Sequence, residues 1–141
     1  MGPDFLALLD FLEHDNAYLA ETEVFADAMN VARDGGDWWG WSEVVVAYDR
    51  RVERELEWLS ANPPSYCYKG LWDLIQLRSE TMHDVLMYQA DLVQSDVPGI
   101  GVLHPVFQAD SEALSKHLDE ALGGLQEVNV QIEAMTLPSC Q

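Results

Sequence analysis

The sequence predicts an all-α protein, an antiparallel bundle of about four main helices that takes in residues 1–141 as a single acidic domain. Two observations support this prediction. Apolar residues recur at spacings of three and four through most of the chain, as they do in amphipathic helices. In addition, no segment alternates between apolar and polar residues regularly enough to indicate a β-strand.

The clearest predicted helix covers residues 66–94, and we expect the other helices to pack around it. Arg78 and Gln89 interrupt its apolar stripe and need polar partners if they are buried. The stripe itself consists of Leu71, Leu74, Ile75, Met82, Val85, Leu86, Leu92 and Val93.

An earlier helix is predicted from Pro3, which suits a first turn because its missing N–H is no loss there, to the glycines at 35–36. We prefer one helix that can carry a kink, and the alternative is two helices that break near Asp15. Another helix should begin with Ser42 as its N-cap and end at Asn62, because the two prolines that follow disfavour helical geometry. We expect Arg51 and Glu55 to form a surface ion pair on it.

Three tryptophans lie in the predicted loop between these two helices: Trp38, Trp39 and Trp41. One interpretation is a lid over the end of the core, because a tryptophan buries a large area. The other is an exposed aromatic anchor for a partner, since tryptophan is enriched at interface hot spots.

The last predicted helix begins at Pro105, after a loop over residues 95–105, and ends near Leu137. Its apolar stripe runs from Leu114 to Met135 and could pack within the chain or form a homodimer. Gly123 and Gly124 interrupt this helix, and they indicate either close packing against a neighbour or a kink.

The chain is strongly acidic, with 25 Asp and Glu against 7 Lys and Arg, and a formal net charge of −18. A small domain usually carries a charge of magnitude about 2–8. Such an excess argues against direct binding to nucleic acid or to an anionic membrane, and it favours a cationic partner. Adaptation to a salty habitat and simple solubility are competing explanations.

Two cysteines, Cys67 and Cys140, are too few for a disulfide scaffold and fit no metal motif. We therefore expect two reduced thiols in a cytoplasmic protein. The N-terminal residues lack the basic segment of a signal peptide, and no apolar run approaches the length of a membrane span.

Residues 80–83 form a Glu-x-x-His sequence of the kind found in ferritin-like di-metal bundles. However, Glu80 and His83 fall on the polar face of the predicted helix, whereas bundle ligands should point inward. The last helix offers only the reversed order, His117 and Glu120. Cys67 has no histidine placed to activate it. We therefore predict no catalytic residues, no cofactor, no metal site in the bundle core and no enzymatic activity.

The acidic surface is the remaining functional feature. Carboxylates three or four residues apart on a helix stand about 5–6 Å apart, so rows of them can imitate the charges of a nucleic-acid backbone. The predicted partner-binding acids are Asp10, Glu13, Glu23, Asp27, Asp73, Glu80, Asp84 and Asp91. The three tryptophans would add apolar contact.

In size, charge and helicity the chain resembles the small acidic inhibitors of phages and bacteria. These include nucleic-acid mimics that block restriction or CRISPR complexes, and immunity proteins that neutralise basic toxins. The resemblance implies a non-enzymatic inhibitor that blocks the basic, nucleic-acid-binding surface of a partner protein. The alternatives are a ferritin-like metal-binding bundle that uses Glu80 and His83, and an assembly subunit that dimerises.

Overall fold

The computed structural model describes residues 2–96, 111–136 and 138–140. Within these ranges the chain forms four α-helices and one short 3₁₀ turn, with no strand, which confirms the predicted all-α class. The elements are α1 (Pro3–Asp34), α2 (Trp38–Ala61), the 3₁₀ turn (Tyr66–Tyr68), α3 (Lys69–Asp96) and α4 (Ser111–Ala134).

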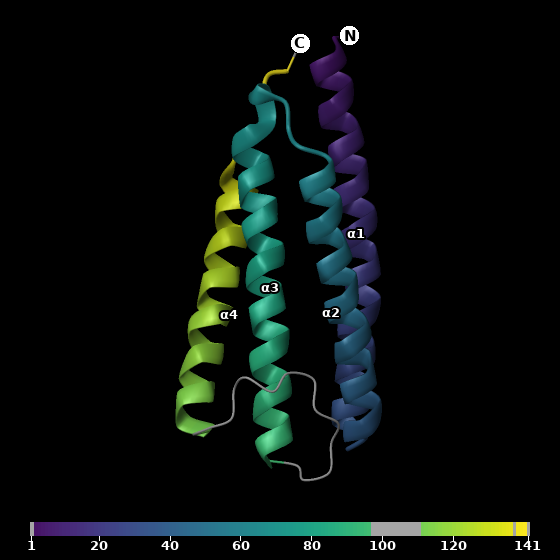
Figure 1. The fold of residues 1–141 in the computed structure, drawn as a ribbon, viewed down its shortest axis with the longest axis vertical. Coiled ribbons are helices and arrows are strands. Elements are labelled where there is room, and N and C mark those ends of the chain that lie inside the picture. Colours follow the sequence, from purple (N-terminus) through teal and green to yellow (C-terminus); the bar gives the residue numbers. More distant parts are fainter. Residues whose placement is uncertain (1, 97–110, 137, 141) are drawn as a thin grey trace.

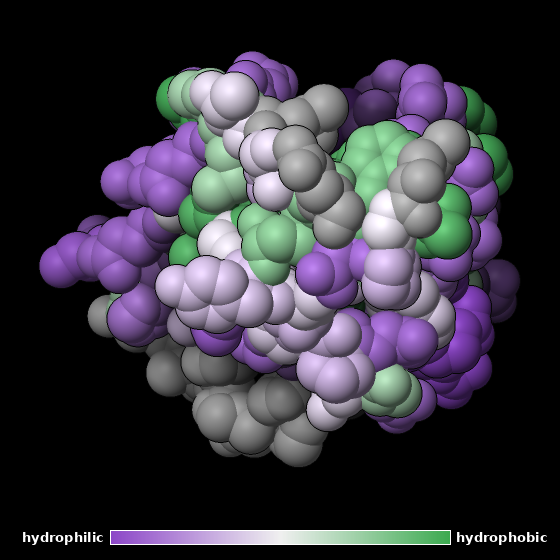
Figure 2. Space-filling model, turned by 90° about the horizontal axis from the view of Figure 1, so that it is seen from above, coloured by the Kyte–Doolittle hydropathy of each residue, from purple (hydrophilic) through white to green (hydrophobic). Residues whose placement is uncertain are grey.

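The four helices run along one common axis, each antiparallel to the helix before it, and both termini lie at the same end (Figure 1). The most extensive packing joins α3 to α4, followed by α1 to α2 and α2 to α3. α3 packs between α2 and α4, and α2 in turn packs between α1 and α3, so the inner position predicted for α3 is shared with α2. Figure 2 looks down on the end with both termini, where hydrophilic residues cover most of the flanks and hydrophobic residues are exposed between them.

α1 is one continuous helix of 32 residues, so the predicted alternative of a break near Asp15 is wrong. The chain leaves the helix through Gly35, whose N–H donates to the carbonyl of Val31 at 3.1 Å. Gly36 then adopts φ 70°, a left-handed conformation that favours glycine. The predicted glycine terminus is thereby confirmed.

α2 begins five residues earlier than predicted, at Trp38, because Asp37 and not Ser42 is its N-cap. The Asp37 carboxylate accepts a hydrogen bond from the N–H of Gly40 at 2.9 Å. A Cβ atom at Gly40 would lie 2.3 Å from a carboxylate oxygen of Asp37, so the glycine leaves room for the cap. The tryptophans therefore lie in the first turn of a helix and not in a loop.

The apolar stripes meet in two clusters, one near each end of the bundle. The cluster near the termini joins α1, α2 and α3 through Leu8, Phe11, Leu59, Leu71 and Ile75. The other joins α2 and α3 through Trp41, Val45, Tyr48, Val52, Leu86, Met87 and Ala90. Burial of these side chains is the main favourable contribution to folding.

Cys67 and Cys140 form a disulfide, with Cα atoms 5.6 Å apart, so the prediction of two reduced thiols is wrong. The bond joins the turn before α3 to the segment after α4, 73 residues later. Sequence spacing gives no information about this proximity, because it depends on how α3 and α4 pair. Both cysteines belong to the cluster near the termini, where Cys140 is buried.

α4 packs its apolar stripe against α3, and Leu114 and Val128 are buried within the chain. The face predicted for a homodimer is therefore largely covered, although Met135 stays more than one third exposed. Gly124 lies against α3, where an added Cβ would meet Thr81 at 3.8 Å, whereas Gly123 has open space beside it. The predicted helix start at Pro105 and most of the predicted loop over residues 95–105 lie outside the described residues.

Candidate functional site

Four of the predicted partner-binding acids lie exposed on α1: Asp10, Glu13, Glu23 and Asp27. No ion pair joins any of these four to a cation in the part of the chain that the structure describes. Glu23 and Asp27 are one helical turn apart, so they present two like charges side by side. This pair costs the isolated helix a few tenths of a kcal/mol, roughly the size of a typical helical ion pair.

On α3, Asp73, Glu80 and Asp84 are exposed as predicted. Lys69 donates to Asp73 at 2.8 Å, and the Gln76 amide donates to Glu80 at 3.0 Å. Both contacts are on the surface and contribute little to stability.

Asp91 does not belong to the exposed acidic surface, because only 2% of it is exposed. The prediction placed it on the polar face of α3, in line with Asp84. The buried side of α3 changes along the helix, however, since Met87 and Ala90 pack in the same cluster as Trp41. Asp91 lies one and four residues from them and is enclosed with them.

The tryptophans divide between the two interpretations. Trp41 is buried, 5% exposed, so it is a core residue and not a partner anchor. Trp38 is half-buried and packs edge-on against Trp41, with ring centroids 5.9 Å apart. Trp39, 61% exposed, is the residue of the three that can contact a partner. It lies on the first turn of α2, beside the end of α1.

Buried charges form a network between α1, α2 and α3. Arg78, the predicted interruption of the α3 stripe, forms a buried ion pair with Asp15 of α1. Glu55, 1% exposed, accepts from His14 at 2.5 Å and lies 3.7 Å from Arg51. The expected Arg51–Glu55 pair is therefore real, but it lies inside the bundle and not on its surface.

Tyr18 lies within this network, with the guanidinium carbon of Arg51 4.9 Å from the centre of its ring. Burial raises the pKa of Tyr18 to about 12, so its hydroxyl stays protonated at neutral pH. Arg78 and Arg51 thus pair with buried carboxylates in a chain that has only seven Lys and Arg, although Nε of Arg51 also donates to the exposed Glu21 at 2.6 Å. Fewer cations then remain to balance the acids on the surface.

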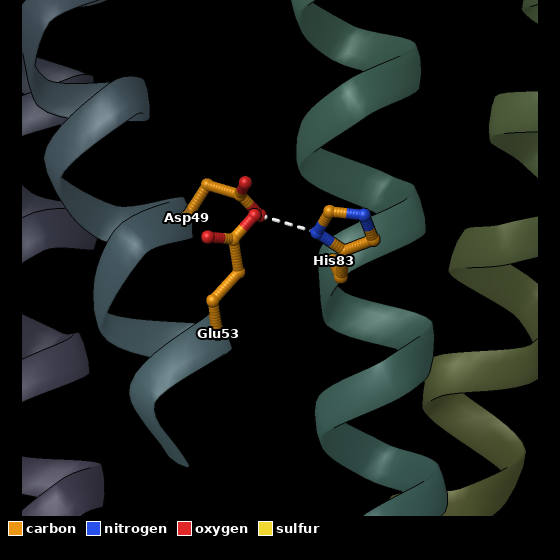
Figure 3. Close-up of side chains that lie close together, drawn as sticks. All are labelled: Asp49, Glu53 and His83. Carbon is orange, nitrogen blue, oxygen red and sulfur yellow. Dashed lines mark hydrogen bonds and ion pairs between the residues drawn. The ribbon is translucent and has the colours of Figure 1, made fainter. Parts of the chain in front are cut away.

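A second arrangement of acids joins α2 to α3 (Figure 3). Asp49 and Glu53 are one turn apart on α2, and His83 of α3 points toward them. The Nδ1 atom of His83 lies 2.6 Å from Oδ1 of Asp49. This hydrogen bond to a carboxylate raises the pKa of His83, and the nearby charges of Asp84 and Glu53 add to the effect, while burial opposes it.

Glu80, which the ferritin-like alternative pairs with His83, is not part of this group of three. Among the described residues, Glu80 and His83 therefore do not come together in a group of three candidate metal ligands, as the ferritin-like alternative would require. Sequence reasoning missed Asp49 and Glu53, although their spacing of four residues was a visible signal. Their relation to His83 depends on how α2 and α3 are aligned, which the sequence does not reveal.

A mostly apolar cavity of about 410 Å³ lies among all four helices, next to the cluster that contains Trp41. Its lining includes Met29, Trp38, Met82, Leu118 and Leu122, with Arg33 as its one cation among the described residues. A cavity of this size could admit a small ligand, but its walls offer few polar groups that would orient one.

Comparisons with protein-family models, with curated proteins and with solved structures find no match to this chain. Among the described residues, no helix combines the length and apolar character that a membrane span requires.

Proposed function

We propose that this chain is a non-enzymatic protein that binds and blocks a basic surface of a partner protein through its acidic helix faces. The observation that carries the proposal is the exposed pair Glu23 and Asp27 on α1, which has no balancing cation among the described residues. Like charges at this spacing are unfavourable in the free protein. A cationic partner would relieve that repulsion when it binds.

The placement of the cations supports the same proposal. Arg78 neutralises a carboxylate inside the bundle, and Arg51 lies between the buried Glu55 and the exposed Glu21. In contrast, three of the predicted partner-binding acids face solvent with no such ion pair among the described residues: Asp10, Glu13 and Asp84. An exterior with this charge attracts a basic protein over a distance of about 8–10 Å at physiological salt. Complementary charge of this kind speeds association and rejects acidic competitors.

Apolar contact is available beside the acids of α1. Val24 and Val31 are 67% and 74% exposed, and they alternate with Glu23 and Asp27 along the helix. Trp39 follows on the first turn of α2. A surface that mixes carboxylates with exposed apolar groups can provide specificity as well as charge.

The cytoplasmic location expected from the sequence rested largely on reduced thiols. Because disulfides persist mainly in oxidising compartments, the Cys67–Cys140 bond removes that support. We propose that the protein meets its partner where this bond stays oxidised. Both kinds of partner, a nucleic-acid-binding protein and a basic toxin, offer the same surface chemistry.

The test compares three forms of the full chain in affinity capture at low salt. Wild type is compared with two charge reversals, Glu23→Lys with Asp27→Lys on α1, and Glu80→Lys with Asp84→Lys on α3. Each reversal changes the net charge by four units, from −18 to −14. We expect at least one of them to weaken capture of the same basic protein by about tenfold or more.

A matched control carries Glu127→Lys with Glu133→Lys, two exposed acids of α4 outside the proposed surface. It makes the same change in net charge on another face. The control therefore separates the effect of one particular face on binding from the effect of the total negative charge. If both reversals retain the partner as well as wild type does, the proposal is wrong. Equal weakening by all three would instead indicate attraction to total charge alone.

A further inference from the structure

The cluster of Asp49, Glu53 and His83 differs from the other ionic groups of the interior. Their three ligand atoms, one imidazole nitrogen and two carboxylate oxygens, all lie within 4.8 Å of one another. Asp49 is 7% exposed, His83 is half-buried and Glu53 faces solvent. The group therefore has a buried side at Asp49 and a solvent-exposed side at Glu53.

The charge of this cluster is not balanced by arginine or lysine. Of the buried carboxylates, Asp15 has Arg78 as its cation and Glu55 has Arg51. Asp49 instead has only a histidine, which carries a positive charge only when it is protonated. No Lys or Arg ion pair to Asp49 or Glu53 occurs within the described residues. Two carboxylates thus share one imidazole in a partly desolvated position.

We propose that Asp49, Glu53 and His83 bind one divalent transition-metal ion, with Zn²⁺ as the best match. Imidazole nitrogen with carboxylate oxygen is a donor set that suits Zn²⁺, and three protein ligands with one water complete a tetrahedral site. Bonds of about 2.1 Å would place the donor atoms roughly 3.4 Å apart. The ion replaces the proton now held between His83 and Asp49, so these two side chains separate slightly when it binds.

The fold prepares this site in two ways. Asp49 and Glu53 are four residues apart on α2, which puts both carboxylates on one face of the helix. His83 belongs to α3, so the ion would join the two helices that contain most of the core cluster around Trp41. The exposed side of Glu53 gives the ion a path from solvent.

The experiment titrates ZnCl₂ into the full chain, stripped of metal by a chelator, and follows binding by calorimetry. The imidazole ¹⁵N signals of the histidines are recorded in parallel, because direct coordination shifts Nδ1 of His83 and leaves the other histidines unchanged. The variants are H83Q and E53Q. E53Q changes an exposed residue and should fold normally, so the test does not depend on the stability of H83Q.

Two matched controls are available on the surface. E80Q removes a carboxylate one turn from His83 that hydrogen-bonds Gln76 and lies outside the cluster. H117Q removes an exposed histidine whose Nδ1 atom lies 4.0 Å from Oε2 of Glu120. These two side chains form a surface pair that is able to bind metal weakly. Neither control should alter Zn²⁺ binding at the proposed site.

The proposal expects one equivalent of Zn²⁺ to bind, with the affinity reduced about tenfold or more in H83Q and E53Q. E80Q and H117Q should match wild type, and the Nδ1 signal of His83 should move on binding. Binding of several equivalents with no effect of E53Q would identify adventitious surface binding and overturn the proposal. An unchanged His83 signal at saturation, or an equal loss in E80Q, would overturn it as well.

Discussion

Replacing Arg78 with Met should lower the free energy of unfolding by about 3–5 kcal/mol, the usual cost of removing one partner from a buried ion pair. Arg78 and Asp15 are 7% and 8% exposed. Nη1 of Arg78 donates to Oδ2 of Asp15 at 3.3 Å, and Nη2 donates to Oδ1. The variant leaves the carboxylate buried without its cation. A cavity of about 170 Å³ beside Arg78 gives water some access, so we expect a value near the lower limit, about 3 kcal/mol.

The assay is urea denaturation at 25 °C, followed by far-ultraviolet circular dichroism. The control is D10N, which changes an exposed acid on α1, the helix that also contains Asp15. It should change the free energy of unfolding by less than about 0.5 kcal/mol. The double variant D15L/R78M should cost less than R78M alone, because it leaves no unpaired buried charge. A loss below about 1 kcal/mol for R78M, or a double variant no more stable than R78M, would refute this reasoning.

Three further predictions concern stability. W41A should lower the free energy of unfolding by about 3–5 kcal/mol and W39A by less than about 0.5 kcal/mol, since Trp41 is buried and Trp39 is 61% exposed. Equal losses of stability in denaturation would contradict these assigned positions. The buried carboxylate of Asp49 raises the pKa of His83 in the folded protein. The stability that this pair contributes is therefore complete below the pKa of His83 in the unfolded chain, about 6.5, and is lost as pH rises through its pKa in the folded protein. The stability gap between wild type and H83Q, measured by denaturation across this range, should shrink toward alkaline pH; a gap that widens would be inconsistent. Replacing Cys67 and Cys140 with Ser should lower the free energy of unfolding by about 2–4 kcal/mol, measured against wild type with and without reductant; no difference under oxidising conditions would show that the disulfide adds no stability.

Helical periodicity predicted much of the core that α2 and α3 contribute. Val45, Val52, Ile75 and Leu86 are all buried, because a spacing of three and four residues places them on one side of a helix. The same pattern identified Arg78 as a residue that would need a partner. It could not identify Asp15 as that partner, since the pairing depends on how two helices are aligned.

The wrong predictions have two physical origins. Asp37 and Ser42 are both acceptable N-caps, and the choice depends on the close approach of Asp37 to Gly40. Asp91 is buried because the packed side of α3 changes along its length, which a fixed helical repeat does not include. Cys67 and Cys140 meet only once α3 and α4 have paired. The cap is a local contact that either of two nearby residues could have made, whereas the burial of Asp91 and the disulfide depend on contacts between elements, which local sequence patterns do not specify.

The central claim, that the acidic faces bind a basic protein surface, is tested most directly by displacing the captured partner. The immobilised full chain captures partners from source-cell extract at low salt, and salt or nucleic acid is then added. A basic protein that is released by salt, displaced by DNA or RNA, and poorly captured by the Glu23→Lys, Asp27→Lys variant is the predicted result for a nucleic-acid mimic. Release by salt but not by nucleic acid would indicate a basic toxin as the partner. Capture of an acidic protein that stays bound at high salt would contradict the claim. Capture by both reversed variants equal to capture by wild type would contradict it as well.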